Sequence, residues 1–426
     1  MAFDLQAALR MVVEQEGSDL HLKVPSPPRI RIKGMLHPVE GAEPLTPDDT
    51  EKVLREMLTA SDRLSEFARD GEIDFSYTVG GLARFRVNAF RQRGSISIVC
   101  RVVPFTIKTI DELELPDVIK TLADESRGII LVTGTTGSGK STTLAAMIDQ
   151  INSTHARNIV TIEDPIEYLH RDRKSIVHQR EVGFDTNSFA QALRRVLRQD
   201  PDVILIGEMR DEETVATALS AAETGHLVFS TLHTIDAVET INRIIDFFPP
   251  HQHQQIRAML GGSLKGVVSQ RLIPTADGEG RVPAVEVMTM TGRVRDLIED
   301  SNETGKLSEV IAEGGYYGMQ TFDQHLLELY QKGKISYDVA LVTATHPHDF
   351  NLLVAAEGQR STGVEQLYDD VGEKSRGPGG DQGPPPPAAP DAKPDAKPAV
   401  DAASGGEGPE ASDGPGRASI SVAPPN

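Results

Sequence analysis

The stretch that decides the fold is GIILVTGTTGSGKSTTLAAMIDQI, residues 128–151. Its apolar run from Ile129 to Thr133 predicts a buried strand, and a helical pattern resumes at Lys140. Between them lies the pattern G-x-x-x-x-G-K-[ST], a phosphate-binding loop in its required setting of strand, loop and helix. Glycines let successive backbone N–H groups turn toward phosphate oxygens, and the helix start presents its positive dipole end. The stretch therefore predicts a nucleoside triphosphate site.

The loop also assigns roles to individual residues. We expect Lys140 to reach the β- and γ-phosphates and the Ser141 hydroxyl to ligate Mg²⁺, so the predicted cofactors are ATP and Mg²⁺. The predicted phosphate-binding residues are Gly134, Thr135, Thr136, Gly137, Ser138, Gly139, Lys140, Ser141 and Thr142.

Composition narrows the class of protein. The 426 residues are enough for two or three domains, and the single cysteine, Cys100, excludes a disulfide framework within one chain and favours a reducing cytosol. There is no N-terminal export signal and no run of about 18 apolar residues, so we expect no transmembrane segment. The net charge is −20, which argues against nonspecific nucleic-acid binding.

Residues 1–105 mix helical and strand patterns without a parallel strand–helix rhythm, which predicts a small α+β domain. We expect a helix within 1–16 and a single helix from about Pro47 to Ala68, capped by Thr46. Residues 106–116 are expected to be a linker. The predicted strands of this domain cover 18–24, 29–32, 73–79, 82–92 and 95–103.

From residue 117 to about 350, strands alternate with helices, which predicts a parallel sheet covered on both faces. A charged loop with a short hairpin is expected after strand 158–162, and helical patterns include 250–269 and, from about 291, a helical C-terminal part. Residues 361–426 are rich in Pro, Gly, Ala and Asp, so we expect a disordered acidic tail that serves as a linker or tether.

Carboxylates follow two of the apolar strands. Strand ends in a parallel sheet line the crevice where ligands bind. Glu163 ends the strand 158–162 and is a candidate for activating the attacking water, although a charged turn would look similar. Glu208 follows the strand 202–206 and is a candidate to complete Mg²⁺ coordination with Ser141, directly or through water.

Two histidines, His226 and His233, flank the apolar strand 227–231. A lone histidine is more often structural, but two beside the acidic strand ends are candidates for γ-phosphate sensors or hydrogen-bonded relays. A zinc site is not expected, because no other ligands have suitable spacing.

Arginines of the N-terminal domain are candidates to contact phosphate. Arg84 and Arg86 share one strand face by period two, and Arg101 lies on the next strand. Arginine binds phosphate in bidentate fashion, and one from another domain or subunit would stabilise a transferring phosphoryl group. A solvated basic strand face is the alternative.

These stretches, in this order and spacing, resemble the ATPases of the type II/type IV secretion and pilus superfamily, and most closely the pilus retraction type. The matching motifs are the phosphate loop, the acidic box at 163–167, LRxxPDxxxxGEMRD at 197–211 and the histidine box at 226–233. The resemblance implies a PAS-like domain, then a RecA-like motor domain, with nucleotide bound in a hexameric ring. It implies that Glu163 is the base, that Glu208 serves Mg²⁺, and that His226 and His233 lie near the γ-phosphate and the subunit seam.

A motif near the C-terminus supports the retraction type. Residues 293–300, RVRDLIED, align with the AIRNLIRE-like motif of these ATPases, with Arg295, Leu297 and Ile298 matching while Asp296, Glu299 and Asp300 depart. The resemblance implies a cytoplasmic protein at the inner face of the cell membrane. Its partners would be copies of itself, an inner-membrane pilus platform protein and other pilus ATPases, with no direct nucleic-acid partner.

Three functions are compatible with these observations. The leading hypothesis is a motor ATPase that powers pilus retraction and twitching motility. The second is a regulatory ring, or an accessory to a sister pilus or secretion ATPase, that binds nucleotide with little turnover. The third is a nucleic-acid translocase, which the acidic charge and the aromatic content of 5% disfavour.

Overall fold

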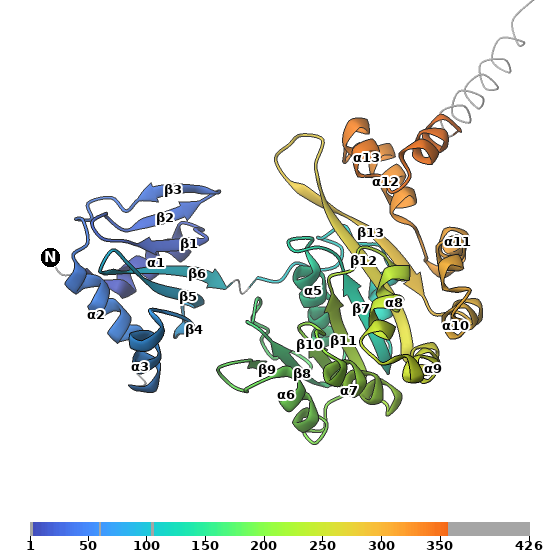
Figure 1. The fold of residues 1–426 in the computed structure, drawn as a ribbon. Coiled ribbons are helices and arrows are strands. Elements are labelled where there is room, and N and C mark those ends of the chain that lie inside the picture. The colour runs from blue at the N-terminus through green and yellow to red at the C-terminus, as the bar shows by residue number, and fades with distance from the viewer. Residues whose placement is uncertain (1–2, 59–60, 104–105, 357–426) are drawn as a thin grey trace, which may run out of the picture. The chain divides into compact units, whose positions relative to one another are not determined.

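The structure is a computed structural model that describes residues 3–58, 61–103 and 106–356. Its N-terminal part contains a six-stranded antiparallel sheet in the order β3-β2-β1-β6-β5-β4 (Figure 1). The strands are β1 (Asp19–Leu22), β2 (Arg29–Ile32), β3 (Met35–Pro38), β4 (Glu72–Val79), β5 (Ala83–Gln92) and β6 (Ser95–Val103).

Three helices supply the rest of the N-terminal core: α1 (Leu5–Glu14), α2 (Pro47–Met57) and α3 (Ser61–Asp70). They pack on one face of the sheet, where Phe85, Val87 and Ala89 of β5 are fully buried. Because side chains alternate along a strand, Arg84 and Arg86 share the other face, as the sequence predicts.

Two predictions for this part are corrected. The single helix expected from Pro47 to Ala68 is two helices, because Leu58 is buried and takes an extended backbone (φ −99°, ψ 90°) that ends α2 after Met57. The strand β3 was not expected. Its side chains are all exposed, so it lacks the apolar alternation by which strands are recognised.

The second sheet has seven strands in the order β13-β12-β7-β11-β10-β8-β9, all parallel except the antiparallel pair β12–β13. Together the two sheets and their helices confirm the predicted α/β fold class. The strands are β7 (Gly128–Thr133), β8 (Asn158–Glu163), β9 (Ile176–Glu181), β10 (Val203–Ile206), β11 (Leu227–Leu232), β12 (Leu264–Pro274) and β13 (Arg281–Thr289).

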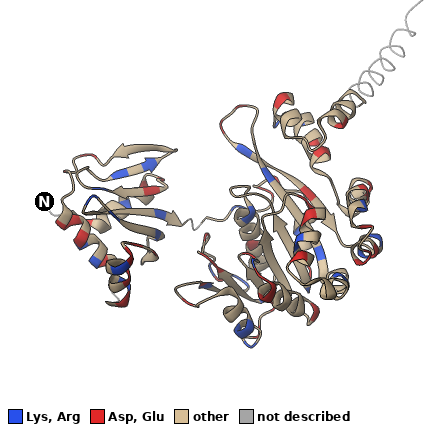
Figure 2. Cartoon of the chain, in the orientation of Figure 1, with Lys and Arg blue, Asp and Glu red and all other residues tan. Residues whose placement is uncertain are grey.

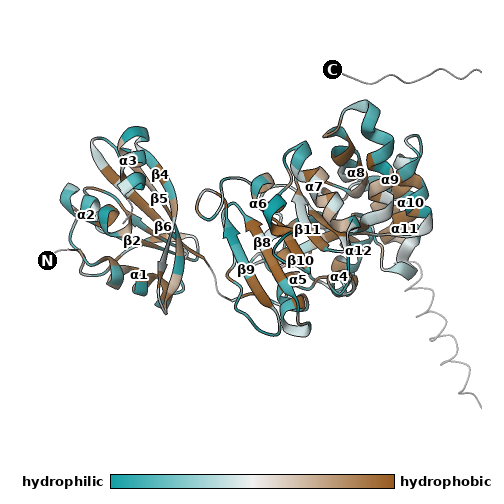
Figure 3. Cartoon of the chain, turned by 90° about the horizontal axis from the view of Figure 1, so that it is seen from below, coloured by the Kyte–Doolittle hydropathy of each residue, from teal (hydrophilic) through white to brown (hydrophobic). Residues whose placement is uncertain are grey.

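Helices cover both faces of this sheet. Along each inner strand, successive side chains point alternately toward the helices on one face and the helices on the other. Ile129 and Leu131 of β7 pack with α6 to α11, whereas Ile130 and Val132 pack with α4 and α5. The central strands β8 and β10 are brown in Figure 3, as strands buried on both faces should be. The helices are α4 (Val118–Ala123), α5 (Lys140–Thr154), α6 (Phe189–Val196), α7 (Glu212–Glu223), α8 (Ala237–Asp246), α9 (His253–Ser263), α10 (Gly292–Glu299) and α11 (Leu307–Glu313).

Two segments of this sheet differ from the prediction. The hairpin expected after β8 is a single strand, β9, which pairs parallel with β8. The helix expected over 250–269 ends at Ser263, and Leu264 starts β12, which pairs with β7 and forms a hairpin with β13. The sequence has apolar residues at helical spacing here, namely Leu260, Leu264, Val267 and Val268. Residues from Leu264 onward nevertheless form a strand, because they pair with the buried strand β7.

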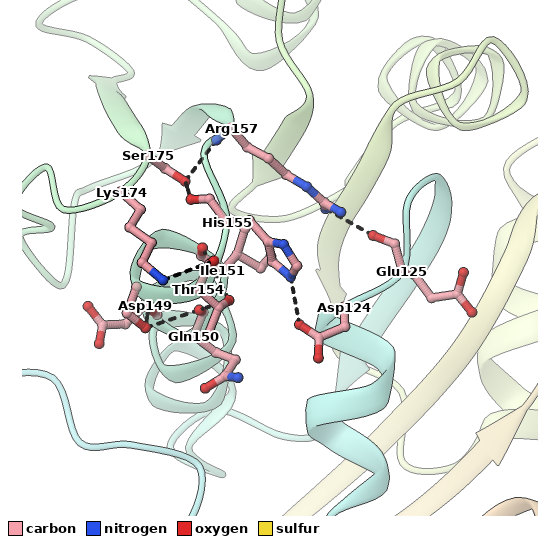
Figure 4. A network of polar contacts seen from close by, with 11 residues as sticks. Asp124, Glu125, Asp149, Gln150, Ile151, Thr154, His155, Arg157, Lys174 and Ser175 are labelled. Atoms are coloured by element: carbon pink, nitrogen blue, oxygen red, sulfur yellow. Dashed lines mark hydrogen bonds and ion pairs between the residues drawn. The ribbon is translucent and has the colours of Figure 1, made fainter.

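Polar contacts hold the start of β9 against the start of β8 (Figure 4). The Ser175 hydroxyl donates to the His155 carbonyl at 2.6 Å and accepts from the Arg157 N–H at 3.1 Å. Asn152 is fully buried, and its side chain donates to the Arg171 carbonyl at 2.7 Å and accepts from the Arg173 N–H at 3.1 Å. These contacts fix the register of β9, which reaches the candidate site at its other end.

The helices α12 (Phe322–Gln331) and α13 (Tyr337–Thr343) pack on the outer part of the β12–β13 hairpin. The predicted tail, 361–426, lies outside the described residues. Within the described part of the chain, no helix is both long enough and apolar enough to span a bilayer.

Phe229 of β11 provides a test of this core, because its side chain is fully buried. We expect Phe229→Ala to lower the free energy of unfolding by about 3–5 kcal/mol, through lost burial and the cavity left behind. Urea denaturation of the full chain measures this change. The matched control is Phe184→Ala, at a side chain that is 62% exposed, which should change stability by less than about 0.5 kcal/mol. Equal effects would contradict the described core.

Candidate nucleotide site

The loop between β7 and α5 has the backbone that phosphate binding needs. Gly134, Gly137 and Gly139 have φ values of 139°, 79° and 94°, in the region that favours glycine. A Cβ on Gly134 would lie 2.3 Å from the Gln270 carbonyl oxygen, so only glycine fits. No side chain caps the start of α5, whereas Ser188, Asp211 and Asp236 cap α6, α7 and α8. The first N–H groups of α5 are therefore available to an anion.

A cavity of about 260 Å³ opens in front of this loop. It brings together residues from the ends of β7, β8, β10 and β11, the edge at which ligands of parallel sheets bind. Its lining includes the predicted Thr136, Gly137, Lys140, Ser141, Glu163, Glu208 and His233, and also Glu167, Tyr168, His170, Phe189 and Arg210.

Lys140 is the main cation of the cavity. Its ammonium group donates to the Gly134 and Thr135 carbonyls at 2.8 and 2.9 Å, which holds it against the loop. Burial lowers the pKa of Lys140, and the nearby carboxylates of Glu167 and Glu208 oppose that shift. The group is thus partly desolvated and lies against the loop.

Two carboxylates at neighbouring strand ends face different surroundings. Burial raises the pKa of Glu163, while hydrogen bonds from Thr161 (2.6 Å) and Gln179 (3.1 Å) oppose the shift. Glu208 forms an ion pair with Arg210, and one of its oxygens lies 3.4 Å from Nε2 of His233. Glu163 is therefore suited to proton transfer, whereas Glu208 lies in a charged cluster.

The two predicted histidines lie apart. His233 lines the cavity, but His226 precedes β11 at the N-terminal end of that strand, about 20 Å away along the strand. Its Nδ1 lies 2.9 Å from the Ala221 carbonyl oxygen, at the end of α7. Within one chain, therefore, the expectation that His226 lies near the γ-phosphate is corrected, because a strand separates its two ends.

Two of the three predicted arginines form ion pairs away from the cavity. Arg84 makes a 2.9 Å ion pair with Glu181, and Arg101 makes a 2.7 Å ion pair with Asp19. Arg86 lies opposite Arg101 in the β5–β6 register. None of the three arginines lines the cavity in front of the phosphate loop, so any contact with phosphate would involve a movement or a second subunit.

Sequence reasoning missed Gln179, which contacts Glu163, and His170, which lines the same cavity. Gln179 is on β9 and bonds to Glu163, and His170 lines the cavity. Burial lowers the pKa of His170 to about 4, so this ring is neutral near pH 7. Ile176 and Val177, two β-branched residues, were the available signal for a strand, but the sequence does not show that this strand pairs parallel with β8.

Glu286 on β13 caps the helix that follows the His233 segment. Its Oε1 accepts from the Ala237 N–H at 2.8 Å, and burial raises its pKa from 4.5 to about 7. As pH rises from 4.5 to 7, the unfolded chain loses this proton while the folded chain keeps it, so the raised pKa lowers stability across that window. Glu286→Gln keeps a hydrogen-bond acceptor but has no ionisable group. We expect its free energy of unfolding, relative to that of wild type, to increase from pH 5 to pH 8.

Urea midpoints at pH 5 and pH 8 measure this effect, with a relative gain on the order of 2 kcal/mol expected. Glu279→Gln, at an exposed position in the β12–β13 turn, is the control and should show no such difference. A gain that is the same at both pH values would contradict a raised pKa for Glu286.

Comparisons with known proteins define the class. Residues 2–334 match the family model described as "Type II/IV secretion system protein", so the chain belongs to that family. This confirms the resemblance drawn from the motifs.

Particular relatives narrow the class further. The chain is 46% identical over 347 residues to "Type IV pilus retractation ATPase PilT" of Pseudomonas aeruginosa, covering 82% of this chain and 100% of that protein. It is 42% identical over 351 residues to "Type IV pilus ATPase PilU" of the same organism, covering 82% and 91%. A solved structure, the "Pilus Retraction Motor PilT and Bound ADP", matches with a TM-score of 0.76 and 45% identity, over 82% of this chain and 98% of that one. These relatives confirm that the chain is an enzyme of the ATPase type.

Proposed function

We propose that this chain is the subunit of a hexameric motor ATPase that retracts type IV pili and so supports twitching motility. One observation carries the proposal: the phosphate loop and the acidic ends of β8 and β10 meet in one cavity of a chain that is 46% identical to a retraction ATPase over that protein's full length.

ATP with Mg²⁺ is the proposed ligand. The tight loop around Gly134 fits phosphate, because a side chain there would fill the cradle. Ser141 and Glu208 line the same cavity and would hold Mg²⁺. In the described part of the chain, no cluster of three or more His, Cys, Asp or Glu residues could hold a metal by itself. This suits Mg²⁺, which prefers substrate phosphates and water with one or two protein ligands and would neutralise phosphate charge.

In the proposed chemistry, Glu163 accepts a proton from the attacking water, and the raised pKa of this carboxyl moves it toward the working pH. Lys140 holds the β- and γ-phosphates, and residues 134–142 present backbone N–H groups to them. His233, beside Glu208, is placed to sense whether the γ-phosphate is present. His226 is proposed to act only at a subunit boundary, because it lies at the other end of β11.

Six copies would form a ring at the cytoplasmic face of the inner membrane, against a pilus platform protein. Within that ring, Arg84, Arg86 and Arg101 are proposed to reach nucleotide, from their own or a neighbouring subunit. Closure around ATP and opening after hydrolysis would turn γ-phosphate contacts into rigid-body displacement. The family relationship supports this assembly.

A second candidate is an accessory ring that binds nucleotide with little turnover and assists a sister ATPase. The acidic departures from the retraction motif at Glu299 and Asp300 favour this candidate. A nucleic-acid translocase is disfavoured, because the net charge is −20 and acidic and basic residues are interspersed over the helices (Figure 2).

The test in cells is removal of the chain from its own bacterium while fluorescently labelled pili are followed by microscopy. The proposal predicts that pili extend but fail to withdraw, and that the wild-type chain restores withdrawal. Withdrawal at normal frequency but with reduced force would favour the accessory role. Normal withdrawal in both respects would contradict any part in retraction.

A further inference from the structure

Two side chains from neighbouring strands converge on one oxygen of Glu163. Oε1 accepts from the Thr161 hydroxyl at 2.6 Å and from the Gln179 amide at 3.1 Å. The parallel β8–β9 register pairs Thr161 with Gln179, and Glu163 follows Thr161 by two residues, on the same face. The Glu167 backbone N–H also hydrogen-bonds this carboxylate, and among the described residues no side chain donates to Oε2. Oε2 is the oxygen that we take to accept the proton.

The amide of Gln179 can take only one orientation. Its Nε2 also donates to the Tyr168 carbonyl at 2.8 Å, and its Oε1 accepts from the His170 N–H at 2.9 Å. A flipped amide would set its oxygen against the Glu163 carboxylate and against a second carbonyl, and its N–H groups against another N–H. The amide N–H groups therefore face Glu163.

Gln179 also lies within a wider framework. The Tyr168 hydroxyl contacts the Thr142 hydroxyl at 2.8 Å, which joins this loop to the first turn of α5. At its other end, the segment that enters β9 is held by Ser175 (Figure 4) and by Asn152. Neither the side chain nor the strand that carries it can move freely, so the hydrogen bond to Glu163 is pre-set.

We propose that Gln179 is a positioning residue for hydrolysis: it turns the Glu163 carboxylate so that Oε2 faces the nucleotide, and it favours the ionised form. The inference rests on the proposed role of Glu163 as the base. A misplaced catalytic group loses rate steeply, and a donor to a carboxylate stabilises its charged form. Other ionisable groups face the same cavity, and their charges are common to all variants: Lys140, Asp164, Glu167, His170, Glu208, Arg210 and His233.

Gln179→Leu removes the donor while keeping similar bulk. We expect kcat to fall by about 10- to 100-fold, because a hydrogen bond to a charged group is lost, with KM for ATP changed less than about threefold. Because the lost donor lowered the pKa of Glu163, the acid limb of the kcat–pH profile should move to higher pH. Gln179→Glu should move that limb further, since a second carboxylate then faces Glu163.

Thr161→Val removes the other donor to Oε1 and is a second variant should Gln179→Leu fail to fold. It should move the acid limb in the same direction. Gln331→Leu, at an exposed position on α12, is the matched control and should leave kcat and the pH profile unchanged. ATP binding and sedimentation of each variant show whether the assembly is intact.

Wild-type kcat and an unmoved acid limb in Gln179→Leu would overturn the inference, provided that Glu163→Gln is inactive. If Glu163→Gln hydrolyses ATP normally, the proposed base is wrong. The two failures are therefore distinct. A fall in kcat with no change in the pH profile of Gln179→Leu and Gln179→Glu would also contradict the positioning role, because a purely structural defect would produce it.

Discussion

Glu163→Gln should reduce Mg²⁺-dependent phosphate release by about 10²- to 10⁴-fold, the usual contribution of a positioned general base. The amide keeps the shape of the carboxyl and can still accept from Thr161 at the position of Oε1. It cannot take a proton from water, so the chemical step fails while the phosphate loop is untouched. Steady-state phosphate release at saturating ATP measures the change.

Binding separates this result from a folding defect. Glu163→Gln should bind ATP with wild-type affinity or better, because a buried acidic group beside Glu167 is removed from the cavity. Glu279→Gln, an exposed change of the same kind, should hydrolyse ATP normally. If Glu163→Gln turned over at the wild-type rate, the base would have to be another carboxylate of the cavity, with Glu167 and Glu208 the next to test.

Lys140→Gln should weaken ATP binding by about 10- to 100-fold and reduce turnover by at least about 10²-fold. The ammonium group is partly desolvated and is held by the Gly134 and Thr135 carbonyls, so its charge is already aimed at the loop. A neutral amide retains one hydrogen bond but none of the attraction to phosphate charge. Equilibrium binding of a fluorescent ATP analogue measures the first effect.

The matched control is Lys332→Gln, at an exposed lysine that caps the C-terminal end of α12. Its ion pair with Glu328 lies on the surface, where such pairs contribute little. It should bind and hydrolyse ATP as wild type does. Equal affinity of Lys140→Gln and wild type for ATP would mean that the phosphate loop does not hold the triphosphate, which would contradict the whole site.

The site residues that the sequence identified are those whose signal is local. The phosphate loop is a contiguous pattern with strand and helix on either side, so Lys140 and Ser141 could be placed from one stretch. Glu163, Glu208 and His233 each follow an apolar strand, and the rule that parallel strand ends share one edge brings them together. The fold class followed from the alternation of strand and helix patterns after residue 117.

Residues that depend on long-range pairing could not be predicted. Gln179 reaches Glu163 only because β9 pairs parallel with β8 in one register, and nothing in residues 176–181 specifies that partner. The β12 strand has helical apolar spacing and becomes a strand because β7 offers a buried edge. His226 shows the converse: its nearness to His233 in sequence suggested a shared site, but an extended strand separates them.

The most direct test of the account is phosphate release by the purified wild-type chain at saturating Mg²⁺ and ATP, recorded across fractions from a sedimentation run and compared with Glu163→Gln. A motor ATPase predicts that activity follows the ring-sized species and exceeds that of Glu163→Gln by at least about 10²-fold. Equal, near-zero rates from an intact wild-type ring would contradict the motor and favour a nucleotide-binding accessory.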